Sequence, residues 1–169
     1  MPSIPVGILG ATGAVGQQFI ALLANHPWFT VEWLGASQRS EGKAYRDAAA
    51  WRLADRLPDD VAARVVDAAA PGRAPKLVFS GLDSSVAGEI EGAFAKAGHV
   101  IVSNSRNYRM DPNVPLLIPE VNADHLALLE LQAKAGWQGR IITNPNCSTV
   151  VLTTALAPLR QFGLKTVMI

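Results

Sequence analysis

The sequence predicts an α/β fold in which helices cover both faces of a mostly parallel β-sheet. Short runs rich in β-branched residues alternate with longer helical stretches, and a glycine-rich turn lies between the first run and the first helix. Apolar residues make up 49% of the 169 residues and charged residues only 17%, which suits one domain with its own core. A disordered chain and a small disulfide-stapled scaffold are therefore excluded.

Seven strands are expected where short runs are dominated by β-branched and other apolar residues. They cover residues 4–9, 31–36, 64–67, 76–80, 99–103, 116–118 and 140–143. A further strand is expected at residues 164–169, after the break at Gly163. Because a strand needs a partner and no element follows this one, we expect the chain to be the N-terminal portion of a longer protein.

Four helices are expected between these strands, at residues 13–25, 84–97, 123–135 and about 147–162. The first carries an apolar stripe and stops before Pro27. The second can be capped by Asp83 or Ser84 and ends at Gly98. Pro158 limits the regularity of the fourth, because proline removes a helical hydrogen bond.

The charge balance limits what the protein binds. Fifteen Lys and Arg residues against 14 Asp and Glu residues give a formal net charge of +1. Nonspecific binding to nucleic acid or to an anionic membrane needs a strong basic footprint, and no apolar run here is long and unbroken enough for a membrane span. We therefore expect no nucleic-acid or membrane partner, and a small molecule as the ligand.

Cys147 is the only cysteine, which excludes an internal disulfide and a multi-cysteine metal site, and we expect no metal. The first residues are interrupted by proline and glycine and lack the features of a secretory signal. A reducing, cytoplasmic location is the simplest fit.

The glycine-rich turn follows the first strand and opens the first helix. Gly10, Gly13 and Gly16 have the spacing G-x-x-G-x-x-G, and glycines at such a junction let backbone N–H groups approach a pyrophosphate at the positive end of a helix. The sequence therefore predicts a dinucleotide site in a Rossmann-like domain. A generic glycine turn remains the alternative, because short motifs match by chance.

The second expected strand is followed by hydroxyls and cations where an NAD-binding domain places an acid. Ser37, Gln38, Arg39 and Ser40 occupy this loop. An acid would repel the 2′-phosphate of NADP, whereas an arginine can pair with it and serines can donate hydrogen bonds. The loop predicts NADP as the cofactor; a merely polar surface loop is the alternative.

Cys147 lies in the first turn of the fourth expected helix, directly after a polar segment at residues 144–146. The helix dipole and the unpaired N–H groups there favour a thiolate and can stabilise an oxyanion. These features predict a nucleophile. The alternative is a small, buried and inert cysteine.

A polar loop at residues 103–109 follows the fifth expected strand, where open α/β sheets place ligands. Arg109 can hold a phosphate or carboxylate with two hydrogen bonds. The alternative is a solvated loop with incidental arginines. None of the three histidines, His26, His99 and His125, has a position that identifies a catalytic base.

Four segments together closely resemble aspartate-semialdehyde dehydrogenases in order and spacing, and the resemblance covers the whole chain. They are residues 10–16, residues 103–105 with Arg109, residues 119–122 and residues 144–149. Residues 22–27 and 35–40 are most similar to the fungal branch of this family.

The resemblance implies that residues 1–146 form an NADP-binding domain. It also implies that residues 147–169 form a nucleophile-bearing helix and the beginning of a truncated α+β catalytic and dimerisation domain. It implies that Cys147 is the nucleophile and that Asn104 and Arg109 contact the phosphate-bearing end of the substrate. The residues assigned to NADP are Gly10, Thr12, Gly13, Ala14, Val15, Gly16, Ser37, Gln38, Arg39, Ser40, Ser80 and Leu82. No position matches the acid/base residue of the family.

The resemblance also implies the reaction. L-aspartyl-4-phosphate is converted through a cysteine thioester to L-aspartate 4-semialdehyde and inorganic phosphate, on the route to lysine, threonine, methionine and isoleucine. The full-length protein is expected to be a homodimer or homotetramer. Residues 1–169 alone are expected to be inactive, because they lack an acid/base residue.

Two alternatives remain at this point. An enzyme like N-acetyl-γ-glutamyl-phosphate reductase shares the nucleotide loop and the thioester strategy, although the motif at residues 144–149 argues against it. A nucleotide-binding module without catalysis is the other alternative, since the chain holds a nucleophile but no identifiable base.

Overall fold

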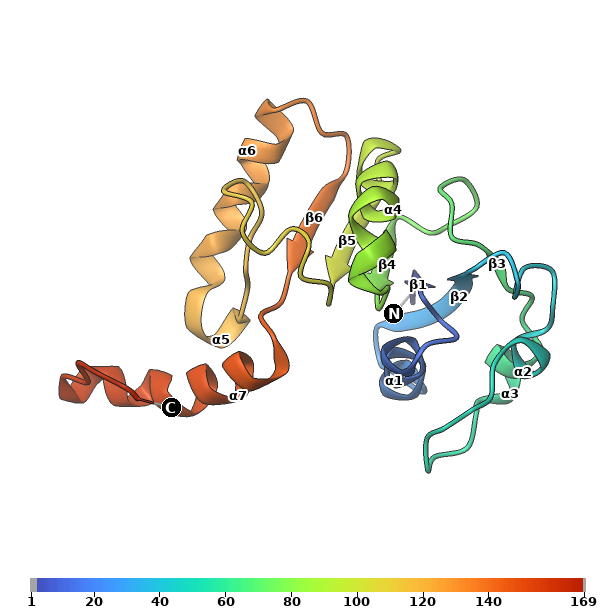
Figure 1. Cartoon of the computed structure of the whole chain (residues 1–169), viewed down its shortest axis with the longest axis horizontal. Coiled ribbons are helices and arrows are strands. Elements are labelled where there is room, and N and C mark those ends of the chain that lie inside the picture. Colours follow the sequence, from blue (N-terminus) through green and yellow to red (C-terminus); the bar gives the residue numbers. More distant parts are fainter. Residues whose placement is uncertain (1–2, 169) are drawn as a thin grey trace.

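The computed structural model describes residues 3–168, which form a parallel sheet of six strands with helices on both sides (Figure 1). The strands are β1 (Ile4–Leu9), β2 (Phe29–Ala36), β3 (Asp67–Ala68), β4 (Leu77–Ser80), β5 (Val100–Ser103) and β6 (Arg140–Thr143). The helices are α1 (Ala14–Leu23), α2 (Tyr45–Ala48), α3 (Asp59–Ala62), α4 (Ser84–Lys96), α5 (Pro119–Asn122), α6 (Leu128–Lys134) and α7 (Cys147–Leu156), with 3-10 helices η1 (Ala123–Ala127) and η2 (Ala157–Phe162).

The strand order is β3-β2-β1-β4-β5-β6, and every pair of neighbouring strands is parallel. The chain runs outward from β1 to β3, crosses back through residues 69–76, and then runs outward in the other direction from β4 to β6. The order therefore reverses between β1 and β4. Ligands of open α/β sheets bind outside the carboxyl ends of the strands at such a switch point.

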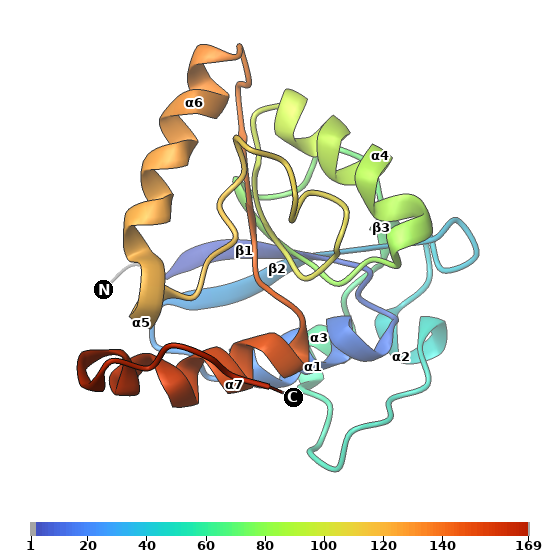
Figure 2. The ribbon, with the colours of Figure 1, turned by 60° about the vertical axis from the view of Figure 1, so that its left-hand side comes forward.

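Two apolar clusters lie on opposite faces of the sheet. Neighbouring residues of a strand point to opposite faces, so Ile8 belongs to a cluster with Ile20 of α1, and Leu9 to a cluster with Phe94 of α4. Figure 2 shows α1 below and α4 above the strands. The expected α/β fold with helices on both faces is confirmed.

The expected strand at residues 116–118 is wrong. Leu116 makes one isolated parallel bridge to Thr143, and the N–H of Ile118 donates instead to Oδ1 of Asn122 at 2.8 Å. Prolines precede and follow the segment, and a residue without an N–H cannot extend a strand ladder. The segment therefore turns into α5 after a single bridge.

Other strands also differ from the expectation, and β2 begins at Phe29 rather than at residue 31. The third strand is at Asp67–Ala68 rather than residues 64–67, because Val65 makes an antiparallel bridge to Ala44 outside the sheet. Residues 164–168 form no strand and make no backbone hydrogen bond to another described segment, and Ile169 lies outside the described residues.

The four expected helices are present, two of them subdivided, and the short helices α2, α3 and α5 were not expected. The third expected helix becomes η1 followed by α6, and the fourth changes from α7 to η2 at Ala157, next to Pro158. Of the two candidate caps for α4, Asp83 is the one observed, because its carboxylate accepts a hydrogen bond from the N–H of Ser85 at 2.8 Å.

Candidate active site

The carboxyl ends of the central strands are level with one another. Leu9 of β1 is paired with Ser80 of β4, Ser80 with Ser103 of β5, and Ser103 with Thr143 of β6. The first residue after a strand then donates its N–H to the last carbonyl of the neighbouring strand: Gly81 to Leu9 (2.9 Å), Asn104 to Ser80 (2.9 Å) and Asn144 to Ser103 (3.1 Å). The loops after β1, β4, β5 and β6 therefore leave the sheet along one edge.

The backbone of the glycine-rich turn lies in close contact with the start of α1. Gly10 has a φ of 73°, and a Cβ at Gly16 would overlap the Gly10 carbonyl oxygen. Gly13 caps α1 without a side chain, and the N–H groups of Ala14 and Val15 have no acceptor among residues 3–168. Free N–H groups at a helix N-terminus are suited to an anion, as the sequence predicted for this turn.

Gly16→Ala is expected to separate α1 from the glycine-rich turn. Overpacking against backbone costs about 1–3 kcal/mol, so the free energy of unfolding falls and Tm falls with it. Gly88→Ala in α4 is the matched control, because the nearest atoms to its Cβ belong to the side chain of Asn107 and not to backbone. Equal Tm values for the two variants in a thermal melt would contradict the close approach at Gly16.

The loop after β2 is a tight turn in which the N–H of Ser40 donates to the carbonyl of Ser37 at 2.9 Å. Ser37, Gln38 and Arg39 are exposed, whereas Ser40 is only 8% exposed. Ser37, Gln38 and Arg39 are therefore the members of this loop that are free to meet a phosphate. The burial of Ser40 leaves its hydroxyl less available than the sequence suggests.

Asn104 and Arg109 are brought together with Asn144, a residue whose side chain the sequence analysis did not single out. Asn144 Nδ2 donates to Asn104 Oδ1 at 2.8 Å, and Arg109 Nη2 donates to the Asn104 carbonyl at 2.9 Å. Arg109 Nε and Asn144 Oδ1 are buried and have no partner among the described residues. The cluster therefore keeps one donor and one acceptor for a ligand.

Helix α4 holds the loop that carries Arg109. Tyr108 donates its hydroxyl to the carbonyl of Gly88 at 2.7 Å, and Ser103 donates to Oε1 of Glu91 at 2.8 Å. Glu91 has no exposed surface, and this burial raises the pKa of its carboxyl group. Neither the burial of Glu91 nor its contact with Ser103 is visible in the sequence pattern of α4.

Cys147 is exposed and opens α7, which begins four residues after the end of β6. Asn146 caps the helix by accepting a hydrogen bond from the N–H of Thr149 at 2.7 Å. The N–H groups of Cys147 and Ser148 have no acceptor in the part of the chain that the structure describes. Among the described residues, nothing buries the Cys147 side chain.

Two further residues assigned to the cofactor lie at the end of β4. Ser80 is fully buried, and its hydroxyl has no partner among residues 3–168. Leu82 is partly buried and packs against the cluster that contains Phe94. Ser80 ends the strand next to the glycine-rich turn and Leu82 follows it, so both lie at the switch point rather than in an exposed loop.

The histidines lie elsewhere. His26 and His99 each precede a strand, which places them at the amino edge of the sheet, and His125 is exposed on η1. His26 Nδ1 accepts the N–H of Phe29 at 3.2 Å, and His99 Nδ1 is 2.8 Å from the carbonyl of Pro75. These contacts support structural roles for both side chains.

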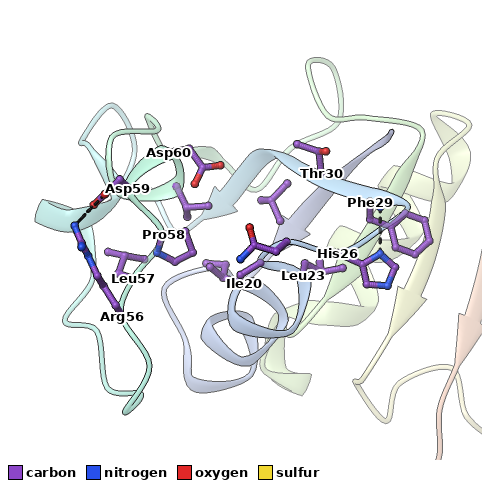
Figure 3. A pocket seen from close by; sticks show the side chains of 14 residues that line it. Ile20, Leu23, His26, Phe29, Thr30, Arg56, Leu57, Pro58, Asp59 and Asp60 are labelled. Atoms are coloured by element: carbon purple, nitrogen blue, oxygen red, sulfur yellow. Dashed lines mark hydrogen bonds and ion pairs between the residues drawn. The ribbon is translucent and has the colours of Figure 1, made fainter. Parts of the chain in front are cut away.

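A cavity between α1, β2 and α3 lies at the amino end of β2 (Figure 3). His26 and Phe29 stack on one side of it, and Arg56 forms an ion pair with Asp59 at 2.9 Å on the other. None of the sequence-predicted site residues lines this cavity. The candidate active site is therefore the carboxyl edge of the sheet and not this cavity.

Residues 3–168 contain no group of three or more histidine, cysteine, aspartate or glutamate side chains placed to hold a metal ion. No helix within the described range has the length and apolarity that crossing a membrane requires.

Comparison with known proteins identifies relatives with this architecture. Residues 5–129 match the family model described as semialdehyde dehydrogenase, NAD binding domain. The aspartate-semialdehyde dehydrogenase of Archaeoglobus fulgidus is 48% identical over 96% of this chain and 48% of its own length. That of Schizosaccharomyces pombe is also 48% identical, over 94% of this chain and 46% of its own length. An archaeal and a fungal relative thus match at the same identity.

Solved structures agree with these matches. The crystal structure of aspartate semialdehyde dehydrogenase with NADP from Candida albicans has a TM-score of 0.88 and 43% identity, covering 96% of this chain and 48% of that one. The Vibrio cholerae aspartate semialdehyde dehydrogenase II complexed with ASA has a TM-score of 0.72 and 28% identity, covering 95% and 47%. The chain spans about half the length of the relatives that it matches. On its sequence, its strand order and the matched model, the chain belongs to the semialdehyde dehydrogenase family and carries its NAD binding domain.

Proposed function

We propose that the protein carrying this chain is an NADP-dependent aspartate-semialdehyde dehydrogenase that reductively dephosphorylates L-aspartyl-4-phosphate. The observation that carries the proposal is the exposed Cys147, which opens α7 at the same sheet edge as the glycine-rich turn and Arg109. The archaeal and fungal relatives bearing this enzyme name, at 48% identity, support the substrate assignment.

The residues at the switch point fit a phosphorylated dinucleotide. Free N–H groups of Ala14 and Val15 suit the pyrophosphate, while exposed Arg39 and Ser37 suit a 2′-phosphate. No acidic side chain stands at residues 37–40 to repel that phosphate. NADPH, when bound there, supplies the hydride that reduces the acyl group to the aldehyde level.

Cys147 performs the covalent chemistry. Its thiolate attacks the acyl carbon of the aspartyl phosphate, the bond from that carbon to the phosphate oxygen breaks, and inorganic phosphate leaves with the bonding electron pair. The product is a thioester on Cys147. After reduction at the same carbon, the carbon–sulfur bond breaks, and the aldehyde leaves while the thiolate is regenerated.

The neighbouring groups stabilise charge and position the substrate. Arg109 and Asn104 hold the phosphate-bearing end. The free N–H groups at the start of α7 stabilise the oxyanion that forms when the thiolate attacks. We assign proton transfer to a residue outside these described groups, because His26 and His99 lie at the other edge of the sheet.

We further propose that residues 1–146 form the cofactor domain and that α7 begins a catalytic domain that also mediates a homodimer or homotetramer. No side chain of α7 is buried, and Val151 is 71% exposed, which leaves an apolar surface for packing. The need to keep the Cys147 thiol reduced supports a cytoplasmic location.

The test is an assay of the full-length protein for NADP reduction with aspartate semialdehyde and inorganic phosphate. We expect turnover that requires phosphate and is faster than with N-acetyl-glutamate semialdehyde under the same conditions. Faster turnover of the N-acetylated substrate would overturn the substrate assignment. Residues 1–169 alone are expected to bind NADP without turnover.

A further inference from the structure

We propose that Tyr45 is a positioning residue of the cofactor site, whose hydroxyl holds the glycine-rich turn with its free N–H groups directed toward a dinucleotide pyrophosphate. The proposal rests on the proposed function, because it assumes that this turn binds the cofactor. It assigns a role to a side chain that no motif in the sequence identifies.

The contact between Tyr45 and the turn is buried and direct. Tyr45 has no exposed surface, and its hydroxyl donates to the carbonyl oxygen of Ala11 at 2.7 Å. Burial raises the pKa of Tyr45, so the phenol remains a neutral donor throughout the physiological range. No water competes at a fully buried site, and the Ala11 carbonyl would lose its partner if the hydroxyl were removed.

Holding the Ala11 carbonyl also fixes the next N–H. The peptide bond between Ala11 and Thr12 is planar and trans, so its C=O and N–H point in opposite directions. The carbonyl is turned into the core toward Tyr45, and the N–H of Thr12 therefore points away from it. That N–H has no acceptor among the described residues, like those of Ala14 and Val15.

A second side chain contacts the carbonyl of the following peptide, whose own N–H, that of Gly13, donates to the carbonyl of Gly10 at 2.9 Å. Gln17 is 1% exposed, and its Nε2 lies 3.3 Å from the carbonyl of Thr12 and 2.9 Å from that of Ala50. The N–H groups of Gly10 and Ala11 donate to the carbonyl of Gly35. The inward-facing groups of the turn are thus bonded to protein, while the outward-facing N–H groups remain free for a ligand.

Tyr45 also joins the turn to the loop that carries Arg39. It begins α2 shortly after that loop, and its own N–H donates to the carbonyl of Arg64 at 2.9 Å. Gly42 donates to the carbonyl of Val66 at 2.8 Å, which fixes the intervening segment. The backbone of Tyr45 is therefore fixed next to the loop proposed to bind the 2′-phosphate. Its side chain contacts the turn proposed to bind the pyrophosphate.

The test compares cofactor affinities by titration calorimetry on the intact protein, well below the Tm of each variant. Tyr45→Phe keeps the ring and removes only the donor, and we expect Kd to rise about tenfold for NADP and for NAD alike, since both carry the pyrophosphate. A residue that only stabilised the fold would lower Tm and leave the affinities of the folded protein unchanged.

Tyr108→Phe is the matched control. It removes a hydroxyl that donates to a backbone carbonyl, that of Gly88, over the same 2.7 Å, but it lies away from the glycine-rich turn. We expect a comparable fall in Tm with an unchanged Kd for NADP. A similar loss of affinity in both variants would show general softening of the fold and overturn the proposal.

The remaining outcomes separate the two proposals. Wild-type affinity in Tyr45→Phe overturns the role of Tyr45 and leaves the cofactor assignment intact, whereas failure of the wild type to bind NADP overturns the proposed function itself. If Tyr45→Phe does not fold, Gln17→Met tests the same inward anchoring of the turn, because it removes the donor to the Thr12 and Ala50 carbonyls together with the acceptor of the Arg52 N–H. Loss of affinity for both cofactors then supports the proposal, and unchanged affinity overturns it.

Discussion

Cys147→Ser is expected to reduce kcat of the full-length protein by on the order of 10³-fold or more, because a serine hydroxyl is far less acidic than a thiol and is a much weaker nucleophile near neutral pH. The exposed thiol at the start of α7 is the nucleophile in the proposed mechanism. The Kd for NADP is expected to remain within about twofold of the wild-type value, since the residues proposed to bind NADP lie at the ends of other strands. Steady-state kinetics and calorimetry measure the two quantities separately.

Ser148→Ala is the matched control for this variant, because it removes an exposed hydroxyl next to Cys147 in the same helical turn. We expect kcat within about threefold of the wild type, as for most surface changes. Mass spectrometry of the wild type during turnover should show an acyl adduct on Cys147. Wild-type turnover in Cys147→Ser would refute the nucleophile assignment.

Arg39→Ala is expected to weaken NADP binding about tenfold to a hundredfold and to leave NAD binding unchanged. One charge-assisted hydrogen bond contributes about 1.5–3 kcal/mol, and only NADP carries the 2′-phosphate that would receive it. Titration with both cofactors gives the selectivity directly. Arg46→Ala, which removes another exposed arginine from the adjacent α2, is expected to leave both affinities unchanged.

The outcome also separates Arg39 from Tyr45. Loss of the guanidinium affects only the phosphorylated cofactor, whereas loss of the tyrosine hydroxyl is expected to affect both. Equal weakening of NADP binding and NAD binding in Arg39→Ala would mean that the loop after β2 does not recognise the 2′-phosphate. The alternative of a merely polar surface loop would then hold.

The sequence predicts the sheet well because its central strands are short apolar runs with strong local signals. β1 coincides with the expected residues 4–9, and β6 with residues 140–143. Once the strands are parallel, their carboxyl ends share an edge, so the positions of Arg109 and Cys147 beside the glycine-rich turn follow from the order of elements. These parts of the site depend on the backbone pattern alone.

The errors and omissions depend on contacts between distant segments. Residues 116–118 have the composition of a strand, but the pairing of Leu116 with the distant Thr143 stops after one bridge, because the next donor toward β6 would be Pro119, which has no N–H. Tyr45 and Ala11 are 34 residues apart, and Glu91 and Ser103 are 12 apart. Which buried polar groups meet is decided by packing in three dimensions, and no local periodicity encodes it.

The crossover at residues 69–76 has a consequence for engineering. It is irregular and mostly exposed, and it separates the stretch that holds the glycine-rich turn and Arg39 from the stretch that holds Arg109 and Cys147. A chimaera of two homologous enzymes joined within these residues would therefore take its 2′-phosphate preference from the parent of the N-terminal part. It would take its substrate recognition from the parent of the C-terminal part. The contact that such a chimaera must keep is the pairing of β1 with β4, because these strands would come from different parents. In this pairing Ile8 lies beside Phe79.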